Sequence, residues 1–127
     1  MQSTKRSLSR RVLVVDDNLD AALILSMCLS AYGHETAVAH DGREAIELAE
    51  SFEPEIIFLD LGMPQMNGYE VAMELRRHPK LADVYIAALT GWNDPKTRAQ
   101  VVTAGFNKHM TKPAKMEDVL EIVDHAA

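Results

Sequence analysis

Five short apolar segments recur along the chain, and each is followed by a longer stretch with helical periodicity. Most of these segments are apolar throughout instead of alternating with polar residues, which is typical of parallel strands covered on both faces. We therefore expect an α/β chain of the (βα)5 type with a doubly wound parallel sheet. The expected strands are VLVV (12–15), TAVA (36–39), EIIFL (55–59), VYIAAL (84–89) and KHM (108–110).

Helix start signals stand between these segments. An Asn or Asp side chain can accept a hydrogen bond from a free backbone N–H group at the start of a helix, and a Glu three residues later strengthens the signal. A Pro directly after the cap suits the first helical position. These signals stand at Asn18, at Asp41 with Glu44, at Asn67 with Glu70, and at Asp94 before Pro95.

The spacing of apolar residues predicts the core face of the first helix. A set of residues recurs at intervals of three and four, which places them on one face of an α-helix: Ala21, Ile24, Leu25, Cys28, Leu29 and Tyr32. Gly33 follows where a helix often ends in a left-handed glycine. Leu19, Leu23 and Met27 form a second apolar stripe on the opposite side, which is a candidate partner surface.

The 127 residues suffice for one domain. Lys5, Arg6 and Arg10 stand in a basic segment without acidic residues. We therefore expect residues 1–10 to be a flexible leader and residues 11–127 to form the domain. All 19 Asp and Glu residues follow this leader. Such an acidic surface repels a phosphate backbone, so we expect no direct binding of nucleic acid.

Other features indicate a cytoplasmic protein. No apolar run approaches the roughly 18 residues that a membrane span needs, and no signal-peptide core follows Met1. Cys28 is the only cysteine, which rules out an intrachain disulfide and a cysteine-based zinc site. We therefore expect no contact with a membrane.

Three acidic residues end two of the expected strands. Asp16 and Asp17 follow the first strand, and Asp60 follows the third. These two strands are neighbours in a doubly wound sheet, so the three carboxylates are expected to converge. Their mutual repulsion favours a bound cation. Hard oxygen ligands at a rigid sheet edge suit Mg²⁺, which keeps several waters that a phosphate can replace.

A hydroxyl and an ammonium group end two further strands. Thr90 closes the fourth strand, and Lys112 follows the fifth. Together with a metal ion they offer the donors and positive charge that a phosphoryl group needs. Pro113 restricts the backbone of Lys112, which limits the positions that the ammonium group can reach.

With these motifs in place, the sequence resembles the receiver domain of two-component response regulators, and most closely the receivers of hybrid histidine kinases. The resemblance covers about residues 11 to 125. It implies a flavodoxin-like strand order of 2-1-3-4-5 and a signalling domain instead of an enzyme. The matching motifs, in the family's order, are VDDN (15–18), DLGMPQMNGYE (60–70), ALTG (88–91) and TKP (111–113).

The resemblance also implies roles for single residues. Asp60 corresponds to the phosphoacceptor, which takes a phosphoryl group from a phosphohistidine on a histidine kinase or a histidine phosphotransfer protein. Asp17, Asp60 and the backbone carbonyl of Gly62 correspond to ligands of Mg²⁺, while Asp16 holds the ion mainly through water. The residues that bind the phosphoryl oxygens correspond to Thr90 and Lys112.

Three positions depart from the common family pattern. His109 stands where many members carry a Tyr or Phe that switches conformation, and it can act either in that way or as a solvated residue at the strand end. Gly62, two residues after Asp60, places no side chain beside the phosphoryl group. Trp92, two residues after Thr90, can shield it from water. Gly62 and Trp92 are therefore expected to tune the lifetime of the phosphoryl group.

Two alternative functions were considered. Phosphatases of the haloacid dehalogenase type also combine an Asp nucleophile with Mg²⁺, but they need a D-x-D motif on the first strand, where this chain has adjacent aspartates. A phosphorylation-independent adaptor is disfavoured because every expected site residue is present. The sequence leaves open the cognate kinase, the output, the lifetime of the phosphoryl group, whether the chain is a free protein or an excised domain, and the oligomeric state, for which a monomer is one option.

Overall fold

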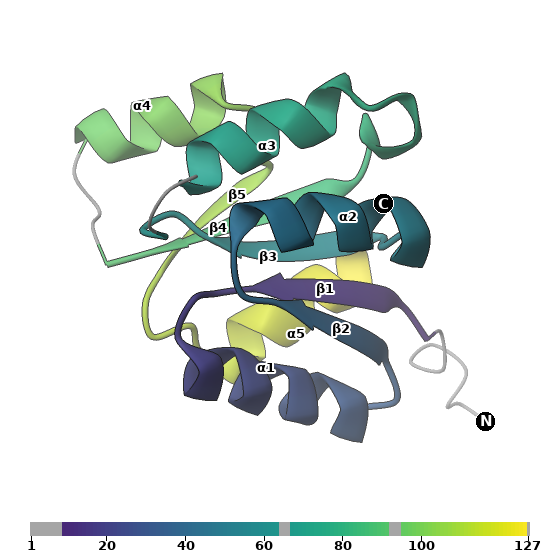
Figure 1. Cartoon of the computed structure of the whole chain (residues 1–127). Helices are drawn as coiled ribbons and strands as arrows, with labels where there is room; N and C mark the ends of the chain where they lie inside the picture. Colours follow the sequence, from purple (N-terminus) through teal and green to yellow (C-terminus); the bar gives the residue numbers. More distant parts are fainter. Residues whose placement is uncertain (1–8, 64–66, 92–94, 127) are drawn as a thin grey trace.

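The computed structural model describes residues 9–63, 67–91 and 95–126, and within these ranges strands and helices alternate along the chain (Figure 1). All strands are parallel and form one sheet in the order β2-β1-β3-β4-β5, which confirms the predicted fold. The strands are β1 (Arg11–Val15), β2 (Glu35–Ala39), β3 (Ile56–Asp60), β4 (Tyr85–Thr90) and β5 (Lys108–Thr111). The helices are α1 (Leu19–Ala31), α2 (Gly42–Phe52), α3 (Gly68–Arg77), the 3-10 helix η2 (Pro79–Leu81), α4 (Pro95–Thr103) and α5 (Met116–His125).

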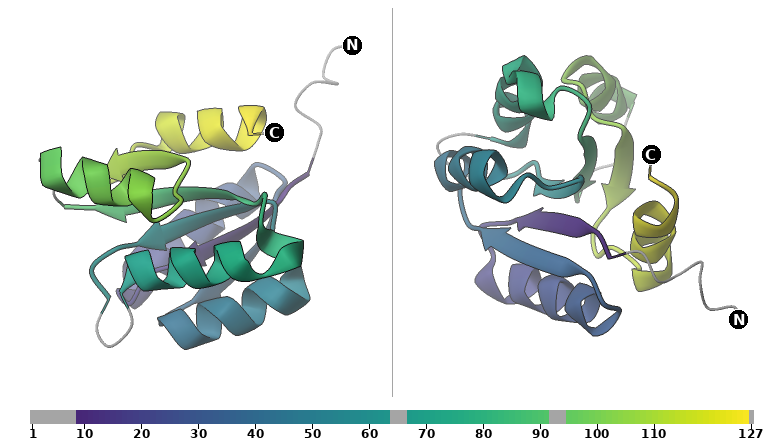
Figure 2. Two further views of the ribbon diagram at one scale, coloured as in Figure 1. Left: turned by 90° about the horizontal axis from the view of Figure 1, so that it is seen from above. Right: turned by 90° about the vertical axis from the view of Figure 1, so that its right-hand side faces the viewer.

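Helices cover both faces of the sheet, with α1 and α5 on one side and α2, α3 and α4 on the other (Figures 1 and 2). Side chains of a strand alternate between the two faces. Val12 and Val14 therefore pack towards α1 and α5, whereas Leu13 and Val15 pack in the opposite core. All five residues of β3 are buried. This double coverage explains why the central strands β1, β3 and β4 are apolar along most of their length, as predicted.

The predicted caps start three of the helices. The side chains of Asn18 and Asp41 accept from backbone N–H groups in α1 and α2 at 3.0 and 2.8 Å. Asn67 and Glu70 form a reciprocal capping box, with both hydrogen bonds at 3.0 Å. Asp94 lies outside the described residues, and α4 begins at Pro95.

The C-terminal end of α1 also agrees with the sequence. Gly33 has a φ of +94°, which lies in the left-handed region that favours glycine. Its N–H donates to the carbonyl of Ser30 at 2.9 Å, and the N–H of His34 donates to that of Leu29 at 3.2 Å. These two bonds satisfy carbonyl groups that the end of a helix leaves without partners.

The predicted core face of α1 is wrong in part. Ile24 and Tyr32 are 62% and 61% exposed, and Ala21 is exposed as well. Leu25 and Cys28 are half-buried, and the buried residues of the helix are Ala22, Ser26 and Leu29. The buried hydroxyl of Ser26 has a hydrogen-bond partner, because it lies 2.8 Å from the hydroxyl of Thr36 on β2. Since α1 is apolar on most sides, spacing alone does not reveal which side faces the sheet.

The start of the domain is tied to the sheet through Arg10. Its N–H donates to His34 Nδ1 at 3.1 Å, and its carbonyl accepts from the N–H of Glu35 at 2.9 Å. Its side chain lies 3.7 Å from the carboxylate of Glu55. Residues 1–8 lie outside the described part of the chain, so the predicted division after residue 10 stays a prediction. No helix in the described ranges is long and apolar enough to span a membrane.

Candidate functional site

The carboxyl ends of β1 and β3 meet at one edge of the sheet. Val15 pairs with Leu59 in the parallel register, so Asp16 and Asp60 stand next to each other in the following position. Both side chains are buried, with exposures of 3% and 5%. Strand alternation and burial of the neighbouring apolar residues leave each carboxylate in a site largely closed to water.

Asp17 completes an acidic cluster with these two residues. One carboxylate oxygen from each of Asp16, Asp17 and Asp60 lies within 4.8 Å of the other two, although Asp17 itself is exposed. Three carboxylates at this spacing match the hard oxygen ligands that Mg²⁺ takes in proteins. The donor set therefore fits the ion that the sequence predicts.

Backbone N–H groups donate hydrogen bonds to the two buried carboxylates. The N–H of Asn18 donates to Asp16 Oδ1 at 3.0 Å, and the N–H of Gly62 donates to Asp60 Oδ1 at 3.2 Å. Burial raises the pKa of Asp16, and the negative charge of Asp60 adds to this effect. The bond from Asn18 and the charge of Lys112 act in the opposite direction. The balance disfavours the ionised form of Asp16, as expected where carboxylates crowd together.

Lys112 brings a positive charge to the cluster from the end of β5. Its Nζ lies 3.1 Å from Asp60 Oδ1 and 3.3 Å from Asp16 Oδ2. The backbone N–H of Lys112 donates to the carbonyl of Thr90 at 2.8 Å, and the Lys112–Pro113 peptide bond is cis. Burial alone lowers the pKa of Lys112, but hydrogen bonds to Asp60 and Asp16 and their charges outweigh burial, so its pKa is raised. Lys112 therefore remains an ammonium ion at the site.

Thr90 stands at the same edge of the sheet, at the end of β4. It is 4% exposed, and it directly follows Leu89, the register partner of Asp60. Thr111 is the register partner of Thr90 on β5. Strand ends far apart in the sequence thus bring Asp60, Thr90 and Lys112 to one edge of the sheet, as the sequence predicts.

Gly62, in the loop after β3, and Gly68, the first residue of α3, differ in their surroundings. Gly62 is exposed, and among the described residues a Cβ placed there meets only Asp60 Oδ1, at 3.9 Å. A Cβ on Gly68 instead lies 2.6 Å from the Asp60 carbonyl oxygen and 2.8 Å from Leu61 Cα. Sequence reasoning missed this role of Gly68. The Asn67-Gly68 pair was a usable signal, because a glycine directly after a cap suits a close backbone approach.

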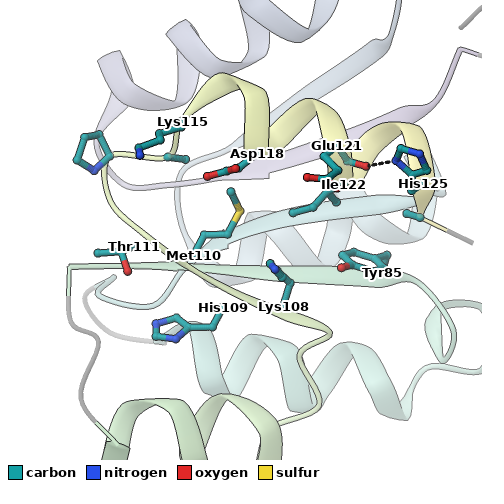
Figure 3. Close-up of a pocket in the computed structure, with 13 residues that line it drawn as sticks. Tyr85, Lys108, His109, Met110, Thr111, Lys115, Asp118, Glu121, Ile122 and His125 are labelled. Atoms are coloured by element: carbon teal, nitrogen blue, oxygen red, sulfur yellow. Dashed lines mark hydrogen bonds between the residues drawn. The ribbon is translucent and has the colours of Figure 1, made fainter.

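His109 lies on β5, opposite Ala88 and half-buried. It borders a groove of about 540 Å³ between β5 and α5, whose lining includes Lys108, Asp118 and Glu121 (Figure 3). Met110 packs with the α5 side of the sheet, so strand alternation turns His109 to the α4 side. Trp92, the other aromatic position singled out in the sequence, lies outside the described residues.

Comparisons with known proteins agree with this fold and site. The sequence pattern of the response regulator receiver domain matches residues 12–124. The chain is 35% identical over 115 residues to the CAI-1 autoinducer sensor kinase/phosphatase CqsS of Vibrio cholerae, which covers 90% of this chain and 17% of that protein. The chemotaxis protein CheY4 of Vibrio cholerae superposes with a TM-score of 0.87 at 28% identity, over 91% of this chain and 97% of that one.

A solved complex from Saccharomyces cerevisiae is also similar. It contains the histidine phosphotransfer protein Ypd1 and the receiver domain of the response regulator Ssk1. One of its chains superposes with a TM-score of 0.82 at 27% identity, over 89% of this chain and 85% of that one.

The chain therefore belongs to the response regulator receiver domains, the signalling domains of two-component systems. The matches give no support to the phosphatase alternative, since the matched family is that of receiver domains. The chain spans between 17% and 50% of the length of the first three curated relatives.

Proposed function

We propose that this receiver takes a phosphoryl group onto Asp60 from a phosphohistidine of a histidine kinase or a histidine phosphotransfer protein. The observation that carries the proposal is the position of Asp60. Its carboxylate is buried at the carboxyl edge of the sheet, 3.1 Å from the ammonium group of Lys112 and within the acidic cluster. A carboxylate is a competent nucleophile for phosphoryl transfer when its position and charge are controlled in this way.

Asp16, Asp17, Asp60 and the carbonyl of Gly62 would hold Mg²⁺. The ion supplies positive charge that offsets the carboxylates and the incoming phosphoryl oxygens. Three ionised carboxylates, a divalent cation and the ammonium group of Lys112 sum to a neutral site before transfer. This balance supports Mg²⁺ over a monovalent ion. A monovalent ion leaves the site with a net negative charge, which repels the phosphoryl donor.

Transfer forms a bond between a carboxylate oxygen of Asp60 and phosphorus, while the bond between phosphorus and the donor histidine breaks. The electron pair of the broken bond stays on the imidazole, which takes up a proton from solvent. Lys112 and Thr90 bind oxygens of the transferred group, and Asn18 and Gly62 hold the carboxylates in place through their N–H groups. Gly62 places no side chain beside Asp60, so this position is expected to tune the access of water and the lifetime of the phosphoryl group.

The output is a change in the surface formed by α4, β5 and α5. Thr90 moves towards the phosphoryl group, and α4, the next helix along the chain, responds. His109 lies on β5, two residues before Thr111, which is the register partner of Thr90. It can therefore respond to the space that the side chain of Thr90 leaves. Phosphorylation thereby biases two arrangements of one binding surface. The proposed role is signalling, with self-dephosphorylation as the only turnover.

The partner surface that we propose lies on α1 beside the site. Leu19, Leu23 and Met27 are 58%, 54% and 61% exposed. On another side of α1, a cavity of about 600 Å³ that none of these three residues lines is bordered by apolar residues that include Ile24 and Leu25, and it reaches Asp16 and Lys112. Apolar surface next to a reacting group suits a helix that carries the donor histidine. The complex of Ypd1 with a receiver domain supports a partner of this kind.

Labelling with a small phosphodonor tests the phosphoacceptor. Incubation with Mg²⁺ and acetyl phosphate is expected to add one phosphoryl mass that is labile to base, and Asp60→Asn is expected to remain unlabelled. Asp20→Asn, which changes an exposed acid in the first turn of α1, serves as the matched control. Equal labelling of wild type and Asp60→Asn contradicts the assignment, and turnover of a phosphate ester favours the phosphatase instead.

A further inference from the structure

Arg76, near the C-terminal end of α3, holds separate segments of the chain together. Its Nη1 donates to the carbonyl oxygens of Val84, Ala82 and Leu81, at 2.7, 3.0 and 3.4 Å, in the segment that leads into β4. Its Nε and Nη2 donate to the carbonyl oxygen of Gly105, at 3.0 and 2.8 Å, in the turn between α4 and β5. One side chain therefore connects α3, the entry of β4 and the exit of α4.

Asn107 extends this connection to the strands. Its Oδ1 accepts from Arg76 Nη2 at 2.8 Å and from the backbone N–H of Ile86 at 2.7 Å. Its own N–H donates to the carbonyl of Ile86 at 2.8 Å. We refer to Arg76, Gly105 and Asn107 together as the Arg76 clamp. The clamp fixes the chain just before β5 against β4.

Only a guanidinium group can make this set of bonds. Arginine offers five donors in a planar fork, whereas the ammonium group of lysine offers three on a flexible stem. Within the described residues, no carboxylate lies within ion-pair distance of Arg76, although the charge of Asp83 acts on it from further away. The guanidinium is instead surrounded by carbonyl dipoles. Removing it leaves several acceptors without a partner, which costs more than the loss of one surface ion pair.

The rest of α4 buries little side-chain surface. Of the nine residues of α4, all of them in the described part of the chain, only Val101 is buried. Val102 is 73% exposed. Few buried contacts are typical of an element that opens or shifts at low free energy. α4 is the next helix along the chain after β4, which ends at Thr90, and it leads into β5 (Figure 1). Gly105 and Asn107 of the Arg76 clamp stand between α4 and β5 in the sequence.

We propose that the Arg76 clamp is the fixed end about which α4 moves when Asp60 carries a phosphoryl group. The inference rests on the proposed function of the site. A displacement that starts at Thr90 reaches the N-terminal end of α4 first. The clamp holds the C-terminal end and the start of β5, so the displacement becomes a swing of the helix instead of a shift of the whole α4 and β5 face. Arg76 is thus a positioning residue for the output surface.

Amide hydrogen exchange tests the clamp in the full chain. The samples are wild type, Arg76→Gln, Asn107→Ala and the control Arg77→Gln, each measured with and without Mg²⁺ and beryllofluoride, a mimic of the phosphoryl group. Arg77 is the matched control because it is the next residue on α3, is exposed, and pairs only with Glu74 among the described residues, at 3.1 Å. Asn107→Ala removes one acceptor of the clamp from an exposed position, so it keeps the test valid if Arg76→Gln fails to fold.

In wild type the response to beryllofluoride is expected in the N-terminal half of α4, with residues 104–108 unchanged. In Arg76→Gln, exchange of residues 101–108 without ligand is expected to be about tenfold faster relative to β1 and β3, and the response to spread into residues 104–108. Asn107→Ala should show the same pattern to a smaller extent, and Arg77→Gln should match wild type. Labelling of Asp60 by acetyl phosphate should stay within about twofold of wild type in all three variants.

Two results overturn the inference. The first is a wild-type pattern of exchange and response in Arg76→Gln. The second is equal acceleration of all amides, including those of β1 and β3, which shows that Arg76 supports only global stability. A wild-type protein that does not respond to beryllofluoride contradicts the proposed function of the site instead. The comparison of exchange rates without ligand does not depend on that function, so the two failures are distinguishable.

Discussion

Lys112 Nζ lies 3.1 Å from Asp60 Oδ1, which joins the ends of β5 and β3 across the end of β4 that lies between them. The same ammonium group lies 3.3 Å from Asp16 Oδ2. A single cation therefore reaches both buried carboxylates of the site. It lowers their repulsion in the unloaded protein and is already in place to bind an oxygen of an incoming phosphoryl group.

Replacement of Lys112 by Met keeps an unbranched side chain of similar length and removes its charge. Labelling of Asp60 by acetyl phosphate should become about 100-fold slower, because a preorganised donor to the transferred group is lost. The rate is followed by mass spectrometry under saturating Mg²⁺. Lys115→Met, which changes an exposed lysine in the next loop, should label at the wild-type rate. A wild-type rate in Lys112→Met would show that this ammonium group does not act on the phosphoryl group.

Mg²⁺ should stabilise the folded protein, because the acidic cluster exists only after folding. At 100 times the dissociation constant the stabilisation should reach about 2.7 kcal/mol. In EDTA, Asp16→Asn should melt at a higher temperature than wild type, since it removes a buried charge whose ionised form the site disfavours. The same variant should gain less from Mg²⁺. Calorimetry with and without the metal measures both effects, with Asp20→Asn as the control, and a lower melting temperature of Asp16→Asn in EDTA contradicts the charge argument.

Gly68→Ala should destabilise the fold by about 1–3 kcal/mol, because the added methyl group overlaps the backbone of β3 and its loop. The atom nearest to the new Cβ is the carbonyl oxygen of Asp60, at 2.6 Å. Labelling of Asp60 should therefore also be slower. Urea unfolding measures the stability, and Gly91→Ala is the control, since a Cβ there meets no atom of the described part of the chain within 4 Å. Equal stability of the two variants would mean that the loop adjusts without cost.

His34 should make stability depend on pH. Burial lowers its pKa in the folded protein, although the charge of Asp124 opposes this effect. The unfolded chain, with an ordinary pKa of about 6.5, therefore binds a proton at a higher pH than the folded protein. Stability from this group is complete above that pH and decreases as pH falls towards the lower pKa of the folded state. In the structure the backbone N–H of Arg10 donates to His34 Nδ1 at 3.1 Å. Protonation of Nδ1 removes this acceptor.

Urea unfolding at pH 7.5 and pH 5.5 tests the role of His34. His34→Gln should lose less stability between these two values than wild type, because its side chain does not titrate. His125→Gln, which changes an exposed histidine near the end of α5, should behave as wild type. If His34→Gln loses as much stability as wild type on acidification, the dependence arises elsewhere.

Leu23→Glu should slow phosphotransfer from a cognate histidine donor and leave labelling by acetyl phosphate unchanged. The reason is that Leu23 is 54% exposed on the proposed partner surface and lies outside the acidic cluster. Time courses of transfer from a phosphorylated histidine donor, quenched at set times, measure the rate of phosphotransfer. Val102→Glu places the same charge on α4, at a residue that is 73% exposed, and should leave both rates unchanged. Loss of both rates in Leu23→Glu would indicate misfolding instead of a lost contact.

The candidate site could be predicted from the sequence because its residues stand at strand ends. Each strand is a short apolar run, and the polar residue after it marks its carboxyl end, as for Asp16, Asp60 and Thr90. A parallel sheet brings these ends to one edge, whatever the details of helix packing. The predicted strand bounds differ from the structure by one residue at one or both ends, which does not move a residue to another edge. The order of strands was implied by the resemblance and is confirmed.

The tertiary structure decided the features that depend on contacts between distant segments. The buried face of α1 includes Ser26, whose hydroxyl lies 2.8 Å from that of Thr36 on β2. The periodicity of an apolar helix does not reveal such a contact. The need for glycine at position 68 follows from its distance to the Asp60 carbonyl, and the Arg76 clamp joins residues 29 and 31 positions apart in the sequence. Local sequence determined the strands and the polar residues at their ends because short-range patterning suffices for them. Side-chain packing across the fold determined the rest, because it depends on which surfaces meet.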